Sequence, residues 1–256
     1  MIEAVTKQIE TEPRNATLFL RRGELYRAHI DWKSAESDYD RAARLDPKLA
    51  VVDFCRGRML FESGRDERAR VELDKFLAGQ TNHVDALIVR ARVLVRLGQR
   101  QAAVADFTHA IAQAPEPGPE YFLERAQAQA AEGEVDAALR GLDEGVKRLG
   151  PLVTFQLYAM DLDLTRQHFD DALRRLETIS AQSARKEKWL ARRGEILALA
   201  GRRDEAKQAY AGASLAIEAL PPRLRQSPAM MNLKRQVVDA LATLTAKSNP
   251  EAADKK

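Results

Sequence analysis

The residue types that most often carry out catalysis do not gather into a recognisable set in this sequence. Asp161 and Asp163 stand two residues apart, so they point to different sides of a helix and do not form an acid/base couple. No phosphate-binding glycine loop, nucleophile elbow or metalloprotease motif is present. No histidine has another histidine, a cysteine or an acidic residue at metal-ligand spacing on its own helix face: His29, His83, His109 and His168. We therefore expect a protein that is not an enzyme and has neither cofactor nor metal.

Cys55 is the single cysteine, so one chain can build neither a disulfide framework nor a cysteine-based zinc site. We expect Cys55 to be a structural thiol, because nothing near it in sequence lowers its pKa. The first residues lack the basic and apolar segments of a signal peptide. The compartment stays open: cytoplasmic on the sequence as it stands, periplasmic if a signal peptide has been removed.

Charge is abundant and evenly mixed along the chain. The 256 residues include 41 basic and 38 acidic side chains, which gives a formal net charge of +3 and a pI near 9.0. A nucleic-acid-binding protein usually concentrates its basic residues in a patch. No apolar run approaches the length of about 18 residues that a membrane span requires. We expect a solvated mixed surface, and we expect no membrane span.

The most regular charged feature is an arginine that recurs at a nearly constant interval along the chain. In the first three copies an acidic residue follows sixteen positions later: Arg22 with Asp38, Arg56 with Glu72, and Arg90 with Asp106. Two antiparallel helices would bring these residues together. We predict a structural ion pair in each copy rather than a ligand contact. Arg125 and Arg193 lack the acidic partner.

A small residue follows each arginine, and the spacing reveals the elements that carry it. An alanine comes twelve positions after each small residue, and a large apolar or aromatic residue comes four positions after that alanine. The small residues are Gly23, Gly57, Ala91, Ala126 and Gly194. This pattern predicts pairs of closely packed antiparallel helices. Glycines at 64, 98, 133 and 201 are placed to end the first helix of a pair in the left-handed conformation.

These positions resemble the tetratricopeptide-repeat (TPR) family, whose signature of about 34 residues orders bulky, small, aromatic and proline residues. The first copy matches best, through Phe19, Gly23, Tyr26, Ala35, Tyr39, Ala42 and Pro47. The third matches through Leu87, Ala91, Leu94, Gly98, Ala103, Phe107, Ala110 and Pro115. The resemblance covers about four-fifths of the chain. It implies an all-α fold, a right-handed α-solenoid of TPR-like helix pairs with a C-terminal capping helix.

The repeat pattern divides the chain as follows. Residues 1–14 are predicted to form an N-terminal half-repeat or capping helix, and 15–220 are predicted to hold six repeats: 16–49, 50–83, 84–117, 119–152, 153–186 and 187–220. The fifth is the weakest, since Met160 stands where the small residue belongs. Residues 221–247 are predicted to form a capping helix, and 248–256 a disordered tail.

A ligand of such a fold would lie in the concave groove that the first helices line. One groove position is apolar in every repeat, and arginines concentrate in the middle of the groove at 58, 92 and 96. The peptide-binding candidates are Leu20, Glu24, Arg27, Phe54, Arg58, Phe61, Ile88, Arg92, Val95, Arg96, Leu123, Gln127, Leu157 and Asp161. Such a groove suits a segment with acidic groups. In the alternative, the apolar residues pack between helices and the arginines are solvated.

Three functions compete on this evidence. The first is a protein- or peptide-binding adaptor or scaffold, and the second is a structural module that self-associates through its end helices. The third is nucleic-acid binding, which ranks last because only Phe54 and Phe61 could stack bases in the groove. The sequence names neither the partner nor the oligomeric state.

Overall fold

The fold is that of a computed structural model, which describes residues 1–246. This part of the chain is all-α, as predicted, and no strand occurs within it. The predicted tail at 248–256 and the last residue of the predicted capping helix lie outside the described range. No helix between residues 1 and 246 is long and apolar enough to cross a membrane.

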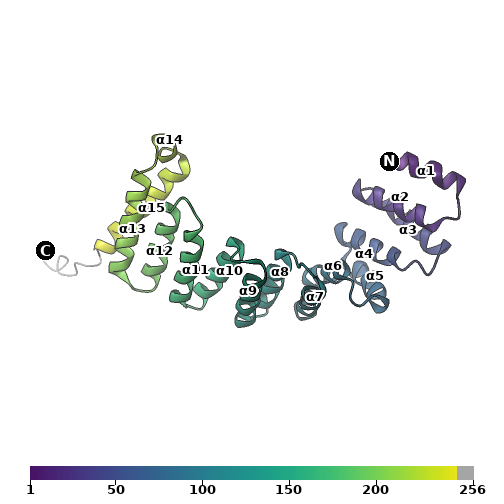
Figure 1. The fold of residues 1–256 in the computed structure, drawn as a ribbon, viewed down its shortest axis with the longest axis horizontal. Coiled ribbons are helices and arrows are strands. Elements are labelled where there is room, and N and C mark those ends of the chain that lie inside the picture. Colours follow the sequence, from purple (N-terminus) through teal and green to yellow (C-terminus); the bar gives the residue numbers. More distant parts are fainter. Residues whose placement is uncertain (247–256) are drawn as a thin grey trace, which may run out of the picture. The chain divides into compact units, whose positions relative to one another are not determined.

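The chain divides into two compact units, Met1–Gly141 and Leu142–Lys256. Within the first unit, each helix contacts the next one along the chain from α1 to α8 (Figure 1). Its helices are α1 Ile2–Thr11, α2 Ala16–Ala28, α3 Trp32–Leu45, α4 Val51–Glu62, α5 Asp66–Gly79, α6 Val84–Arg96, α7 Arg100–Gln113 and α8 Pro119–Ala131. The first helices of successive pairs also meet, α2 with α4 and α4 with α6.

Helix α9 (Val135–Leu149) contains the boundary between the units, at Gly141. The helices of the second unit again pack as neighbours, α10 with α11 and α12 with α13. They are α10 Val153–Thr165, α11 Phe169–Ala181, α12 Glu187–Leu199, α13 Arg203–Glu218, α14 Pro222–Arg225 and α15 Pro228–Ala246. Helix α15 packs on α12 and α13 through buried Val237 and its apolar neighbours.

The small residue of the repeat is required by the close approach of two helices. A Cβ atom built on Gly23 would stand 2.6 Å from the ring of Tyr39, and one on Gly194 would stand 2.8 Å from Tyr210. Both tyrosines are buried, at 0% and 8% exposure. The predicted close packing of the two helices in a pair is therefore confirmed at these positions.

The turns inside the pairs share one left-handed residue. Gly64, Gly98, Gly133 and Gly201 have φ between 74° and 82°, as their spacing predicts. Ile30 and Gln167 take the same conformation, with φ of 63° and 60°, and each stands one repeat length before one of these glycines. Side chains other than glycine strain the backbone in this region, most of all a β-branched one. The fold therefore imposes this turn even where the sequence lacks the favoured residue.

Candidate functional site

The recurring arginines form ion pairs inside the helix pairs. The guanidinium of Arg22 holds Asp38 with two hydrogen bonds, Nε to Oδ2 at 2.7 Å and Nη2 to Oδ1 at 2.8 Å. Arg90 holds Asp106 in the same way, at 2.7 Å for both contacts. The hydrogen bond to its aspartate raises the pKa of each arginine. The predicted structural pairs are confirmed here.

Each of these arginines also reaches back to the preceding helix pair, which sequence analysis missed. Arg56 contacts Glu72 of its own pair at 3.4 Å, but its nearest acid is Asp40 of the pair before, at 2.9 Å. Arg90 Nη1 likewise donates to Asp74 at 2.9 Å. The acceptors one pair earlier occupy equivalent positions in successive pairs: Thr6, Asp40 and Asp74. One guanidinium therefore connects three helices, and its role is structural.

Later copies depart from this pattern. Arg125 is buried and faces the carbonyl oxygen of Gly141, the residue that stands where the acid would be. In the α10–α11 pair the charges are exchanged. Asp163 lies on the first helix and accepts from Arg175 Nε of the second at 2.7 Å, while Arg175 Nη1 reaches Asp143 of α9 at 3.0 Å.

The apolar positions of the predicted groove divide by accessibility. Phe54 and Ile88 are buried, at 7% and 3% exposure. The Phe54 ring packs against Phe76 and His83, with ring centroids 5.5 and 5.0 Å away. These two side chains pack between helices, so for them the alternative interpretation, packing rather than ligand binding, is confirmed. The others are half-buried: Leu20, Phe61, Val95, Leu123 and Leu157.

The charged positions of the first repeat form a closed network. Glu24 accepts from Tyr39 Oη at 2.5 Å, contacts Arg27 at 3.3 Å, and forms an ion pair with Arg58 of α4. Arg27 also reaches Glu62 at 2.7 Å. Burial opposes the charge of Glu24, but these donors outweigh it, so the pKa of Glu24 is lowered. The arginines here already have anionic partners.

The central arginines are engaged too, so the structure does not place them as free solvated cations. Arg92 holds Glu124 of α8 with two hydrogen bonds at 2.8 and 2.9 Å. Arg96 pairs with Asp66, and its Cζ lies 4.0 Å from the centroid of the Phe61 ring. A ligand at this point meets guanidinium groups that are already fixed in position, which is a favourable starting geometry for binding.

A pocket of about 380 Å³ opens among α4, α6 and α8, within the first unit. Its apolar lining comes from Phe61, Val95, Phe107, Ala128 and Ala131. Its polar lining comes from Arg92, Arg96, Arg100, Glu124 and Gln127. The structure thus brings together five of the predicted groove residues: Phe61, Arg92, Val95, Arg96 and Gln127.

Sequence analysis missed half of this lining. Glu124 and Ala131 lie one turn before and after Gln127 on α8, and Ala128 lies one turn from each of these two, so helical spacing could have found them. Phe107 was assigned only to the interior of its repeat. Asp161, in the second unit, is 61% exposed at its side chain and lies 3.5 Å from Arg192.

Cys55 and His168 have side chains that can react or bind a metal, and the structure corrects one expectation about them. Burial and the nearby Glu24 carboxylate raise the pKa of the Cys55 thiol to about 12, so it stays protonated at neutral pH. The expectation that no histidine has suitable neighbours was wrong for His168. Its ligating atoms and those of Asp163 and Asp171 lie within 4.8 Å of one another. The guanidinium of Arg175, however, already donates a hydrogen bond to the Asp163 carboxylate and supplies the positive charge there.

Solved structures of repeat proteins share this arrangement of helix pairs. The structure of YrrB, described as a TPR protein with an unusual peptide-binding site, matches with a TM-score of 0.61 and 21% sequence identity, over 71% of this chain and 93% of that one. The C-terminal part of a TPR repeat-containing protein from Cytophaga hutchinsonii matches with a TM-score of 0.71 and 16% identity, over 94% and 93%. This chain has the TPR fold.

Two further comparisons bear on the TPR assignment. PilW, a type IV pilus biogenesis factor, matches with a TM-score of 0.58 and 20% identity, over 70% of this chain and 83% of that one. Among curated proteins, anaphase-promoting complex subunit 3 of Schizosaccharomyces pombe is 27% identical over 99 residues, which are 39% of this chain. The match spans only 15% of that subunit's length. No protein-family model matches the chain.

Proposed function

We propose that this TPR protein is a non-enzymatic adaptor or scaffold that binds a peptide segment of a partner protein at the pocket among α4, α6 and α8. The observation that supports this best is the pocket itself, which has an apolar interior and a rim of positioned guanidinium groups. Peptide grooves commonly combine such a pocket for one anchoring side chain with polar groups that fix the segment. The peptide-binding site of YrrB supports the same function by analogy of fold.

The pocket specifies what the segment should carry. An apolar side chain of the segment that is buried against Phe61, Val95 and Phe107 contributes about 1.5–3 kcal/mol to the binding free energy. Arg92 holds Glu124 through Nε and Nη2, and its Nη1 has no acceptor within residues 1–246. A carboxylate beside the anchor could accept from that nitrogen. We therefore expect a segment with one large apolar residue and an acidic residue next to it.

A peptide selection tests this proposal. Displayed peptide libraries would be selected against the full chain, and the affinity of enriched peptides would be measured by fluorescence anisotropy. Val95→Glu places a charge in the pocket and should weaken binding at least about tenfold. Val71→Glu makes the same change at an exposed position of α5 and should leave the affinity unchanged.

Two results would contradict the proposal. One is that peptides bind the Val95→Glu variant as tightly as the parent chain while circular dichroism shows both folded. The other is that no peptide is enriched and the mass in solution rises with concentration, which would favour the self-associating module instead.

A further inference from the structure

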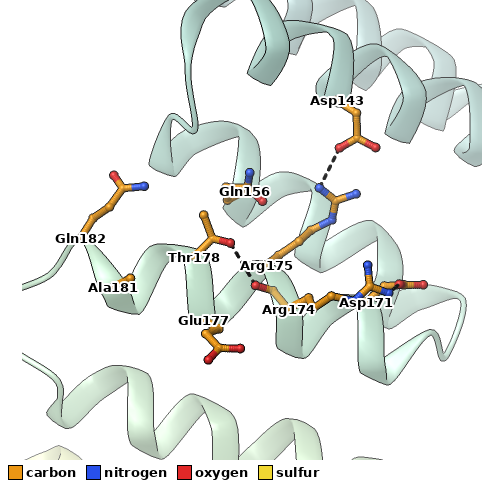
Figure 2. Close-up of a pocket in the computed structure, with 9 residues that line it drawn as sticks. All are labelled: Asp143, Gln156, Asp171, Arg174, Arg175, Glu177, Thr178, Ala181 and Gln182. Atoms are coloured by element: carbon orange, nitrogen blue, oxygen red, sulfur yellow. Dashed lines mark hydrogen bonds and ion pairs between the residues drawn. The ribbon is translucent and has the colours of Figure 1, made fainter.

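Two adjoining hollows flank helix α11 in the second unit, away from the pocket described above. The larger, of about 690 Å³, is lined by residues of α9, α10 and α11, among them Asp143 and Gln156 (Figure 2). The smaller, of about 270 Å³, lies between α11 and α12 and includes Trp189. Glu177 and Ala181 of α11 line both hollows. The two hollows therefore meet at one ridge.

The larger hollow is lined by the amide of Gln156, which has no hydrogen-bond partner within residues 1–246. Gln156 is 6% exposed, and its side chain makes no hydrogen bond to any residue between 1 and 246. A glutamine amide offers two donors and one acceptor, and none of them is paired within the described residues. Packing alone would favour an apolar residue here, since Phe122 and Leu190 stand at the same position of the preceding and following repeats. Gln156 is therefore suited to a ligand that both donates and accepts.

The smaller hollow repeats the observation with a different group. The indole Nε1 of Trp189 is buried and has no acceptor among the residues that the structure describes. An indole N–H can only donate, so an oxygen acceptor in the smaller hollow would satisfy it. Two hydrogen-bonding groups are thus unpaired, one on each side of α11.

The hollows are lined by charged side chains of both signs. Arg175 is held between Asp163 and Asp143, and Arg174 pairs with Asp171, so neither guanidinium offers a free positive charge. Glu177, on the ridge, is exposed and has no ion pair within the described part of the chain. Lys186 and Arg193 line the smaller hollow, so the charge around the two hollows is mixed, and Glu177 is the carboxylate of their shared ridge that a basic group can pair with.

From these positions we infer a second binding site, which takes an extended polypeptide segment lying across α11. A main-chain amide of the segment pairs with the Gln156 carboxamide, a carbonyl oxygen accepts from Trp189, and a lysine or arginine side chain lies beside Glu177. A segment of chain is favoured over a compact molecule because the unpaired groups lie in two hollows on either side of one ridge. Extended peptides present alternating donors and acceptors that suit both groups.

The experiment uses the full chain with Val95→Glu, so that the pocket in the first unit does not contribute. Displayed nonapeptides with a fixed central lysine would be selected against it, and enriched peptides would be measured against three further substitutions. Gln156→Leu should weaken binding about tenfold, as expected for one buried hydrogen-bonding group. Trp189→Phe keeps the ring and should cost about fivefold, and Glu177→Gln about threefold with loss of salt dependence. Gln208→Leu, at an exposed position of α13, is the matched control.

Thermal unfolding separates a binding role from a structural one. Because Gln156 has no internal partner, Gln156→Leu should keep or raise Tm. A clear fall in Tm would show that the amide stabilises the fold, and it would overturn the proposal. Binding that none of the three substitutions changes would also overturn it, as would the absence of enriched peptides, which would leave only water on the amide.

Discussion

The helix pairs α2–α3 and α10–α11 solve the same packing problem with opposite charges. In the first, Arg22 on the leading helix holds Asp38 on the second, with side chains 18% and 7% exposed. In the other, the leading helix carries Asp163 at 3% exposure, and Arg175 at 16% comes from the second helix. Both helix pairs therefore place a buried charge pair between their helices, with the two signs exchanged.

The carboxylate is the more buried partner in each of these pairs, and it is deepest in α10–α11: Asp38 is 7% exposed, Asp106 10% and Asp163 3%. Around Arg22 and Arg90 the guanidinium connects three helices and keeps some contact with water. In α10–α11 the deepest charge is a carboxylate, and burial raises the pKa of Asp163 even though Arg175 opposes that shift. Loss of the arginine should therefore do more damage in the second unit than in the first.

The largest expected effect comes from Arg175→Gln, which leaves the buried carboxylate of Asp163 without its partner. We expect a loss of about 3 kcal/mol in the free energy of unfolding, the lower end of the range for a broken buried pair. Urea unfolding measures it, and hydrogen exchange should locate the change in residues 153–181. Arg174→Gln, whose side chain is 75% exposed, should change stability by less than about 0.5 kcal/mol.

Arg90→Gln should cost about 2 kcal/mol, between the values for buried and for surface pairs, because Asp106 stays buried and the arginine is 23% exposed. The same urea titration measures it. Arg70→Gln is the control, because Arg70 makes only exposed contacts, at 4.0 Å with Asp74 and 3.4 Å with Gln99. A larger loss for Arg90→Gln than for Arg175→Gln would reverse the comparison between the units.

The strained turns offer a stabilising change in each unit. Ile30→Gly should raise the free energy of unfolding by about 1 kcal/mol, because glycine adopts positive φ without steric cost and Ile30 is 69% exposed. Gln167→Gly should give a smaller gain, since Gln167 is not β-branched. Differential scanning calorimetry measures both. A decrease in Tm for Ile30→Gly would show that this side chain contributes contacts that outweigh the backbone strain.

The smallest expected effect is a difference in acid sensitivity. The folded-state pKa of Glu24 lies below the ordinary value of 4.5, so its stabilising contribution is present above about pH 4.5 and is lost as pH falls through the folded pKa. In Glu24→Gln the fall in Tm between pH 6 and pH 3.5 should therefore be shallower than in the parent chain. Glu67→Gln, at an exposed position of α5, should not alter the slope.

The repeated spacing predicted the fold well because the requirement for close packing is local and periodic. Gly23 and Tyr39 stand sixteen residues apart, and no larger residue fits at Gly23, so the sequence records that contact directly. The Arg22–Asp38 pair was predictable for the same reason. The backward contacts of Arg56 and Arg90 were missed because they depend on how neighbouring pairs stack, which no spacing within one repeat reveals.

The candidate site was predicted only in part. Helical spacing found Phe61, Arg92 and Val95, because they share one face of successive first helices. It also nominated Phe54, which is buried by Phe76 of a second helix, a contact that first-helix spacing alone does not show. The exchanged pair at Asp163 was not predicted because its arginine follows twelve residues later, whereas the repeated spacing places an acid sixteen residues after an arginine.

The central claim is that a partner segment occupies the pocket among α4, α6 and α8. The most direct measurement is photo-crosslinking of a selected peptide to full chains that carry benzoylphenylalanine at Gln127, on the exposed rim of the pocket, or at Val71, on the exposed side of α5. We expect a crosslinked product from position 127 and none from position 71. Equal crosslinking at both positions, or crosslinking at 71 alone, would contradict it.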